Sequence, residues 1–315
     1  MGEWSKSVGE KGEEIVNYFF KEILGYNTIL SNASIVCNKG LKHKDKSSKS
    51  NKTTHGIDAL ISSKSPLEDN LLDIGIISSK FTSLAYPNSP KSLFKEYITD
   101  LAFTIECFKN SKMYSDINQK FSNVNRTDIT GILVWASNKS SQNEEIISKV
   151  SNMILDNDLI FDKIIIVDND RINFFVETIQ NAKKEFGSEN VKFVYHNSNL
   201  NTIGLQSISY GDFLPTNYLF SNIIPIRIVN KNDIDFVIFS KENFSKENFS
   251  KLLAFAKSFD LLHSINNIVL SFPEFNQLTD ESIILSELLN FNHYQYGKNL
   301  FVKTHLSDFR NVKKV

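Results

Sequence analysis

Cysteine is scarce in this chain of 315 residues and occurs only at Cys37 and Cys107. The two cysteines form no CxxC motif, and neither has a spacing to histidine that is typical of a metal site. The sequence therefore predicts neither a disulfide scaffold nor a structural zinc site. We expect two free, buried thiols in a reducing compartment, which indicates a cytoplasmic protein.

An excess of charge of one sign is also lacking. Lysine and arginine number 35, aspartate and glutamate 36, and the net charge is −1. The chain thus lacks the overall basic character of many stand-alone nucleic-acid-binding proteins. Any contact with nucleic acid must come from a local patch or from a partner.

Long apolar runs are absent as well. No stretch approaches the roughly 18 uninterrupted apolar residues of a membrane-spanning helix, and the charged start MGEWSKSVGEKGEE contains no apolar signal core. We expect neither a standard export signal nor contact with a membrane. Apolar residues still make up 41% of the chain, enough for a core in one large or two ordinary domains.

The most informative stretch contains two segments of strand character, residues 55–61 (HGIDALI) and 71–81 (LLDIGIISSKF), separated by turn-forming residues. Side chains alternate between the faces of a strand, so Ser78 and Lys80 share one face, and pairing of the two strands would bring Lys80 close to Asp58. A metal-dependent phosphodiesterase needs such a pair. The acid holds Mg²⁺, and the lysine stabilises the attacking water or the charge on the phosphate.

These residues resemble the motif of the PD-(D/E)xK, or restriction-endonuclease-like, nuclease superfamily. Asp58 matches the first acid of that motif, and residues 78–80 (SSK) match its (D/E)xK tripeptide, with Ser78 where the second carboxylate is expected. Some restriction enzymes of the superfamily similarly have Ser-x-Lys and carry the acid on the following helix, where Glu96 lies here. The resemblance implies Mg²⁺ or Mn²⁺ held by Asp58 and Glu96.

The resemblance covers roughly residues 5–135 and implies a mixed sheet flanked by helices, with nucleic acid as substrate and a role in prokaryotic defence against phage.

Simpler interpretations stay open for each of the candidate site residues. Asp58 can be a strand-end acid, Lys80 an edge-strand lysine that discourages aggregation, and Glu96 an ordinary helix-surface residue.

Residues 8–25 have the apolar spacing of an amphipathic helix that ends at Gly25. The superfamily's first helix often directs a glutamate at the metal site, which makes Glu13 the first candidate and Glu10 the second. Glutamates in a first helical turn are also favoured by the helix dipole alone.

A lysine-rich segment, residues 39–54, precedes the first strand and is expected to be a mobile loop that either stays solvated or contacts phosphates. Its candidate nucleic-acid-binding residues are Lys42, Lys44, Lys46, Lys49 and Lys52. His55 follows as a possible second proton carrier, although a histidine before a strand is more often structural.

The helix expected over 91–108 is followed by a polar linker (109–127) and an apolar strand at 128–137, whose composition predicts a central place in a sheet. Alternating helix and strand patterns over 141–198 predict α/β architecture with parallel strands.

Asp168 and Asp170 follow one of these strands, where either a ligand or simple turn chemistry accounts for them. The C-terminal α+β segment contains His263, His293 and His305, without the spacing of a metal site. Its aromatic residues can stack on bases or, more simply, pack in the core; they are Phe291, Tyr294 and Tyr296.

The predicted fold is therefore α/β, with a nuclease-like core (1–137), an α/β extension (138–210) and a C-terminal α+β module (211–315) that senses a signal or binds a partner. Three functions compete: a Mg²⁺-dependent nuclease with a protein partner or as a homo-oligomer, an inactive nuclease-like scaffold that binds nucleic acid or protein, and an unrelated interaction protein.

Overall fold

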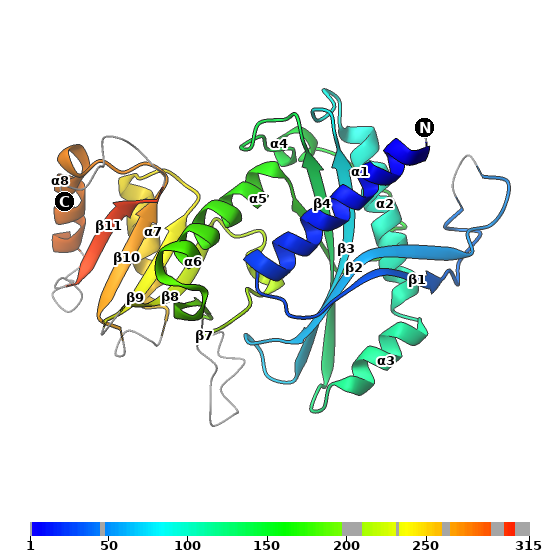
Figure 1. The fold of residues 1–315 in the computed structure, drawn as a ribbon, viewed down its shortest axis with the longest axis horizontal. Coiled ribbons are helices and arrows are strands. Elements are labelled where there is room, and N and C mark those ends of the chain that lie inside the picture. The colour runs from blue at the N-terminus through cyan, green and yellow to red at the C-terminus, as the bar shows by residue number, and fades with distance from the viewer. Residues whose placement is uncertain are drawn as a thin grey trace. The chain divides into compact units, whose positions relative to one another are not determined.

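The computed structural model describes residues 2–44, 48–196, 210–230, 233–259, 265–290 and 299–305. They form two compact units, the first built mainly from 1–65 and 70–173 and the second mainly from 174–214 and 221–315 (Figure 1). None of the described helices combines the length and the apolar character needed to cross a lipid bilayer.

The first unit contains a mixed sheet whose strands are hydrogen-bonded in the order β1-β2-β3-β4-β5. The strands are β1 (Ile29–Val36), β2 (Thr54–Lys64), β3 (Leu71–Thr82), β4 (Arg126–Ser137) and β5 (Lys163–Val167).

The two strand segments predicted around Asp58 and Lys80 are confirmed as neighbours, because β2 and β3 pair antiparallel. Strand β4 is central as expected, since it pairs in parallel with β3 on one side and with β5 on the other. Strand β5, which falls in the expected α/β extension, thus completes the sheet of the nuclease-like core.

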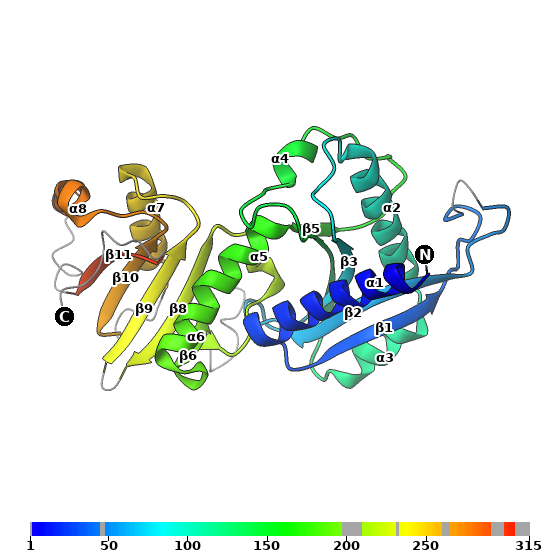
Figure 2. The same ribbon diagram turned by 45° about the horizontal axis from the view of Figure 1, so that its top comes forward.

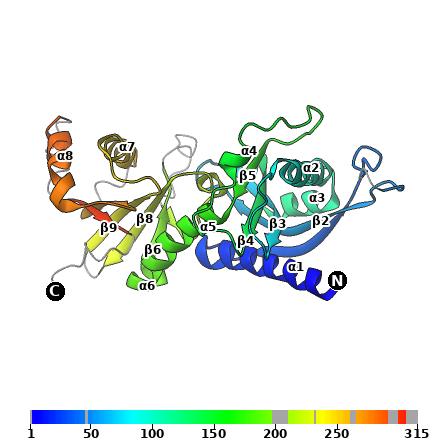
Figure 3. The ribbon, with the colours of Figure 1, turned by 90° about the horizontal axis from the view of Figure 1, so that it is seen from above.

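Two long helices cover the faces of this sheet. Helix α1 (Gly2–Asn17), continued by the π-helical turn Tyr18–Ile23, lies on one side, and α2 (Lys91–Phe108) lies on the other (Figure 3). Figure 2 shows α1 running alongside β1 and β2.

Glycine permits close packing on both faces. A Cβ atom on Gly12 of α1 would lie 2.8 Å from Ser79 Oγ, and one on Gly131 of β4 would lie 2.7 Å from Ile105 Cδ1 of α2.

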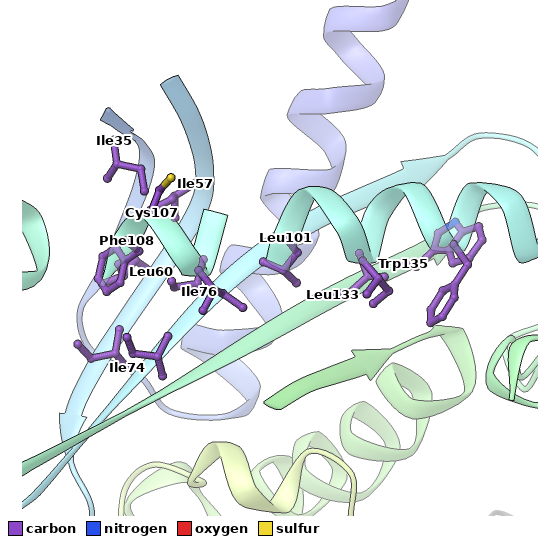
Figure 4. Close-up of a cluster of buried hydrophobic side chains, with 14 of the residues drawn as sticks. Ile35, Ile57, Leu60, Ile74, Ile76, Leu101, Cys107, Phe108, Leu133 and Trp135 are labelled. Atoms are coloured by element: carbon purple, nitrogen blue, oxygen red, sulfur yellow. The ribbon is translucent and has the colours of Figure 1, made fainter. Parts of the chain in front are cut away.

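The core of the first unit lies between α2 and the sheet (Figure 4). Its helix side chains, such as Leu101 and Phe108, pack on strand residues such as Ile76 and Leu133, and all four are at most 2% exposed. The helix expected over 91–108 is therefore amphipathic, and its apolar face is the one that the sheet buries.

Two sequence predictions were wrong in this unit. The first helix expected within residues 141–198 is reduced to one turn, α4 (Ile147–Val150), and Ile154, which follows that turn, is 84% exposed. The expected polar linker contains a helix, α3 (Lys112–Lys120), whose cap Ser111 accepts a hydrogen bond from the Tyr114 N–H at 3.1 Å.

The second unit contains a sheet with the strand order β11-β10-β9-β8-β6-β7. Its strands are β6 (Val191–Val194), β7 (Tyr210–Gly211), β8 (Ile223–Asn230), β9 (Asp233–Ser240), β10 (Asn267–Phe272) and β11 (Leu300–Thr304). Strands β9, β10 and β11 are parallel, but β6 pairs antiparallel with β8, so the prediction of parallel strands was wrong for β6.

The helices of the second unit begin at its boundary with the first. Helix α5 (Asn169–Phe175) spans that boundary and leads through a π-helical turn, Val176–Gln180, into α6 (Asn181–Phe186), and α7 (Lys246–Lys257) and α8 (Gln277–Asn290) follow later in the chain. Helix α6 packs against β6 and β8, and α7 against β9 and β10.

Candidate active site

Asp58 lies on β2 at the point where pairing with β3 ends. The last paired residues are Ala59 and Ile77, and beyond them the Asp58 carboxylate accepts a hydrogen bond from the backbone N–H of Ser79 at 2.6 Å. Just beyond the last backbone pair of β2 and β3, the Asp58 carboxylate thus serves as the acceptor in place of a backbone carbonyl. This hydrogen bond fixes the carboxylate between the two strands.

Charged groups from three other elements act on Asp58. Burial raises the pKa of Asp58, the Ser79 N–H and the Lys80 ammonium group lower it, and the carboxylates of Glu13 and Asp100 raise it further, so that the net shift is upward. The charges of a carboxylate from α1, a carboxylate from α2 and a lysine from β3 therefore all act on the carboxylate of β2. Neighbouring carboxylates that repel one another favour a bound cation.

Lys80 is held by an aromatic pair. Its Nζ atom lies over the Tyr97 ring, 5.2 Å from the centroid, and Tyr97 meets Trp135 edge-on at 5.2 Å. Trp135 is also the residue of β4 that pairs with Lys80. Helix α2 and strand β4 together hold the ammonium group on the side of α2.

Glu13 is half-buried and accepts a hydrogen bond from the Asn32 side chain at 2.9 Å. Asn32 has a φ of 53°, a left-handed conformation that asparagine tolerates better than most residues. The close approach of Gly12 to Ser79 brings this part of α1 onto β3.

The two acids of α2 differ in their surroundings. Glu96 is exposed, and its carboxylate raises the pKa of Tyr97 after the larger effect of burial. Asp100, one turn further along, binds Lys52 at 2.6 Å and acts on the charge of Asp58. Asp100 is thus a further candidate acid, which the sequence predictions did not include, although residues four positions apart, such as Glu96 and Asp100, share one face of a helix.

Ser78 is 9% exposed and lies on β3 opposite Leu133 of β4. Its hydroxyl stands on the strand where the superfamily has a second acid. The assignment of Asp58, Lys80, Glu96, Glu13 and Ser78 as site residues stays a prediction.

Part of the lysine-rich segment is bound within the protein. Lys39 and Lys42 contact the carboxylate of Glu106 at 2.5 and 3.0 Å. Burial by itself would raise the pKa of Glu106, but hydrogen bonds from Lys39, Lys42 and His43 outweigh it and lower the pKa to about 2. Lysines that neutralise a buried acid offer less charge to phosphates than the sequence suggested.

The other candidate lysines divide into three groups. Lys52 is bound to Asp100, Lys44 and Lys49 are exposed, and Lys46 lies outside the described residues.

The other sequence candidates receive simpler explanations. The Asp168 carboxylate is 1% exposed and accepts hydrogen bonds from the N–H groups of Ile146 and Arg171 at 2.7 and 3.1 Å, which is cap chemistry. His305 faces the Ser271 hydroxyl at 3.2 Å. His263, His293, Phe291, Tyr294 and Tyr296 lie outside the described residues.

A mixed sheet with one helix on each face, an acid where two strands part and a lysine on the neighbouring strand define the restriction-endonuclease-like class. Within this class, the model of the GAPS4 protein PD-(D/E)XK nuclease domain matches residues 1–171. The match spans more than half of the chain, which therefore belongs to this family. No curated protein and no solved structure matches the chain.

Proposed function

We propose that the first unit is a metal-dependent nuclease that hydrolyses phosphodiester bonds in defence against phage. The proposal rests above all on the Asp58 carboxylate, which is fixed by the Ser79 N–H and acted on by Lys80, Glu13 and Asp100. The family of the chain supports it, because its model is that of a nuclease domain.

The donor set suits a hard divalent cation such as Mg²⁺ or Mn²⁺, which is bound by carboxylate oxygens and by the substrate phosphate. Asp58 would hold the ion, with Glu13 and either Asp100 or Glu96 as further acids. When bound, the ion supplies the Lewis acid that polarises the phosphate.

Lys80 acts as the fixed positive charge of the site. Because the Tyr97 ring contacts its ammonium group and Trp135 packs against that ring, the ammonium group is in position before the substrate arrives and can stabilise the charge that develops on the phosphate. A preorganised charge of this kind needs no rearrangement at the moment of reaction.

DNA is the first substrate to test, and RNA, including transfer RNA, is the second. The second unit is proposed to bind a protein partner or another copy of the chain. The exposed Lys44 and Lys49 are proposed to contact nucleic acid. A cytoplasmic location and the absence of membrane contact belong to the same proposal.

Cleavage of labelled DNA and RNA by the purified full-length chain with Mg²⁺ or Mn²⁺ tests the function, and Asp58→Asn is the matched control. We expect cleavage that needs the metal and falls at least about a hundredfold in Asp58→Asn. Direct titration of Mn²⁺ into both proteins gives a second measurement. Equal Mn²⁺ affinity of the two would refute Asp58 as a ligand even where no cleavage is seen.

Two further variants identify the second acid. Asp100→Asn and Glu96→Gln each remove one charge from α2, and only the variant that lacks the true ligand should lose cleavage as fully as Asp58→Asn. We expect Ser78→Ala to be milder, since a neutral hydroxyl is a weaker ligand for Mg²⁺.

An inactive, nucleic-acid-binding scaffold is the alternative, and one observation favours it: a hydroxyl, Ser78, stands on β3 in place of the second carboxylate. Binding of nucleic acid without cleavage, together with no measurable Mn²⁺ binding at Asp58, would select this alternative.

A further inference from the structure

Four metal-ligating side chains meet in the first unit, on the same side of the sheet as α2. They are Cys37 just after β1, His43 in the lysine-rich segment, His55 in β2 and Cys107 in α2. One ligand atom from each lies within 4.8 Å of all the others. His43, His55 and Cys107 are at most 1% exposed.

Four of the six distances between these atoms are close to the edges of a tetrahedron around one zinc ion, and the two distances from His55 to the sulfur atoms are at most 4.8 Å. With Zn–S near 2.3 Å and Zn–N near 2.05 Å, the edges of a regular tetrahedron are about 3.8 Å for S···S, about 3.6 Å for S···N and about 3.3 Å for N···N. The structure has 3.9 Å between the two sulfur atoms, 3.4 Å from each sulfur to His43 Nδ1, and 3.2 Å from His43 Nδ1 to His55 Nε2.

Hydrogen bonding alone explains the cluster poorly. The Nε2 atom of His43 faces the ionised Glu106 carboxylate at 2.9 Å, so the proton of a neutral His43 lies on Nε2 and its Nδ1 carries a lone pair. Both sulfur atoms and His55 Nε2 lie within 3.4 Å of that nitrogen, although its lone pair can accept only a single good hydrogen bond. The Cys107 thiol has a second acceptor, Asn38 Oδ1 at 3.1 Å. A cation that accepts electron pairs from all four groups accounts for the convergence.

The surroundings also match those of a metal site. A ligating histidine usually donates its other N–H to a carboxylate or another oxygen, and Glu106 fills that role for His43. For His55, the Thr104 hydroxyl lies 3.5 Å from Nδ1 and gives its own proton to the Asp100 carbonyl at 2.8 Å. Phe103 stacks on the His43 ring at 4.1 Å and excludes water from that side.

We propose that Cys37, His43, His55 and Cys107 bind one structural Zn²⁺. The protein fills all four positions, which leaves none for substrate, so the ion has a structural role. Binding replaces the two thiol protons, which are released, and the two thiolates balance the charge of the ion. This reverses the expectation from the sequence that both cysteines are plain buried thiols.

Metal content tests the proposal directly. The full-length chain, purified under argon without chelators, should contain one zinc per molecule. Replacement of zinc by Co²⁺ should give the visible bands of a tetrahedral ion and a thiolate-to-cobalt charge-transfer band. Less than about a tenth of an equivalent after reconstitution with Zn²⁺, or a cobalt spectrum without the sulfur band, would overturn the proposal.

Variants locate the ion. Cys107→Ser and His43→Asn should lose the metal, while Lys44→Ala, at the exposed neighbour of His43, should keep it. Glu106→Gln should retain the ligands and bind zinc about 10 to 100 times more weakly. Wild-type zinc content in Cys107→Ser, or a Cys37–Cys107 disulfide in place of the metal in protein kept under argon, would contradict the site.

The test of the zinc site does not depend on nuclease activity. Asp58→Asn should contain one zinc per chain, as the wild type does, whether or not the wild type cleaves nucleic acid. Should a ligand variant fail to fold, the cobalt spectrum and a competition between the wild-type chain and a chelator still decide the question.

Discussion

Tyr97 holds the ammonium group of Lys80, and its replacement tests whether that contact positions the proposed catalytic lysine. The Lys80 Nζ atom lies 5.2 Å from the ring centroid, and the ring meets Trp135 at 5.2 Å with an interplanar angle of 83°. Tyr97→Leu removes both contacts, whereas Tyr97→Phe keeps both.

The expected magnitude follows from these two contacts. A cation over a ring stabilises by about 0.5 to 2 kcal/mol, and an edge-on aromatic pair by about 0.5 to 1.5 kcal/mol. Lys80 and Tyr97 are both half-buried, so the lower half of each range applies. Tyr97→Leu should therefore lower the free energy of unfolding by about 1 to 2 kcal/mol, and Tyr97→Phe by less than about 0.5 kcal/mol.

Urea unfolding and single-turnover cleavage measure the two consequences. If Tyr97→Leu loses about 1 kcal/mol of the transition-state stabilisation that a correctly positioned Lys80 provides, cleavage should fall about fivefold while the metal affinity stays unchanged. In a double-mutant cycle with Lys80→Met, the coupling energy of unfolding should be about 0.5 to 1 kcal/mol.

The reasoning is refuted if the coupling lies within error of zero, or if Tyr97→Phe loses as much cleavage as Tyr97→Leu. The first result would mean that Lys80 does not depend on the ring. The second result would mean that the Tyr97 hydroxyl, and not the ring, supports cleavage.

Four further outcomes are expected. At neutral pH, Asp58→Asn should be at least as stable to urea as the wild type, because burial raises the pKa of Asp58 and folding therefore disfavours its charged form. The difference in stability should vanish below about pH 4, where Asp58 is protonated in both the folded and the unfolded chain. Burial lowers the pKa of His305 to about 4, so His305 takes up a proton at a higher pH in the unfolded chain than in the folded protein. The free energy of unfolding should therefore fall by up to about 3 kcal/mol between pH 6.5 and 4. In urea unfolding, His305→Asn should flatten that pH dependence. Gly131→Val should lower the free energy of unfolding by about 1 to 3 kcal/mol, because even a Cβ would lie 2.7 Å from Ile105. Alanine at both Lys44 and Lys49 should weaken binding to all nucleic-acid sequences alike and reduce the slope against salt, as measured by fluorescence anisotropy, and unchanged binding would leave the segment as a solvated loop.

The strands of the site could be predicted from the sequence because their residues are β-branched and apolar, and because turn residues separate them. That information placed Asp58 and Lys80 on adjacent strands. It could not decide between Glu96 and Asp100, which share one face of α2. Which of them reaches Asp58 depends on how α2 lies on the sheet, and that is set by side-chain packing at Gly131, far from either acid in the sequence.

The cysteine–histidine cluster could not be predicted from the sequence for a related reason. Metal sites are recognised by short, regular ligand spacing, whereas Cys37 and Cys107 are 70 positions apart. Antiparallel pairing of β1 with β2, which sets Ile35 opposite His55, and the packing of α2 on the sheet bring the four ligands together. Only the tertiary fold contains that information.

The two proposed metal sites share two structural elements, which gives the structural zinc a consequence for catalysis. His55 and Asp58 are both on β2, and Cys107 and Asp100 are both on α2. An ion that joins His55 to Cys107 fixes the start of β2 against α2, and so fixes the distance between the strand acid and the helix acid. Such a link restrains the carboxylates that a divalent cation must find in place. Removal of zinc should therefore weaken Mn²⁺ binding at Asp58, although no zinc ligand touches that acid. A Mn²⁺ titration of zinc-free, folded protein that matches the zinc-loaded protein would show that the rest of the sheet is enough to hold the two acids.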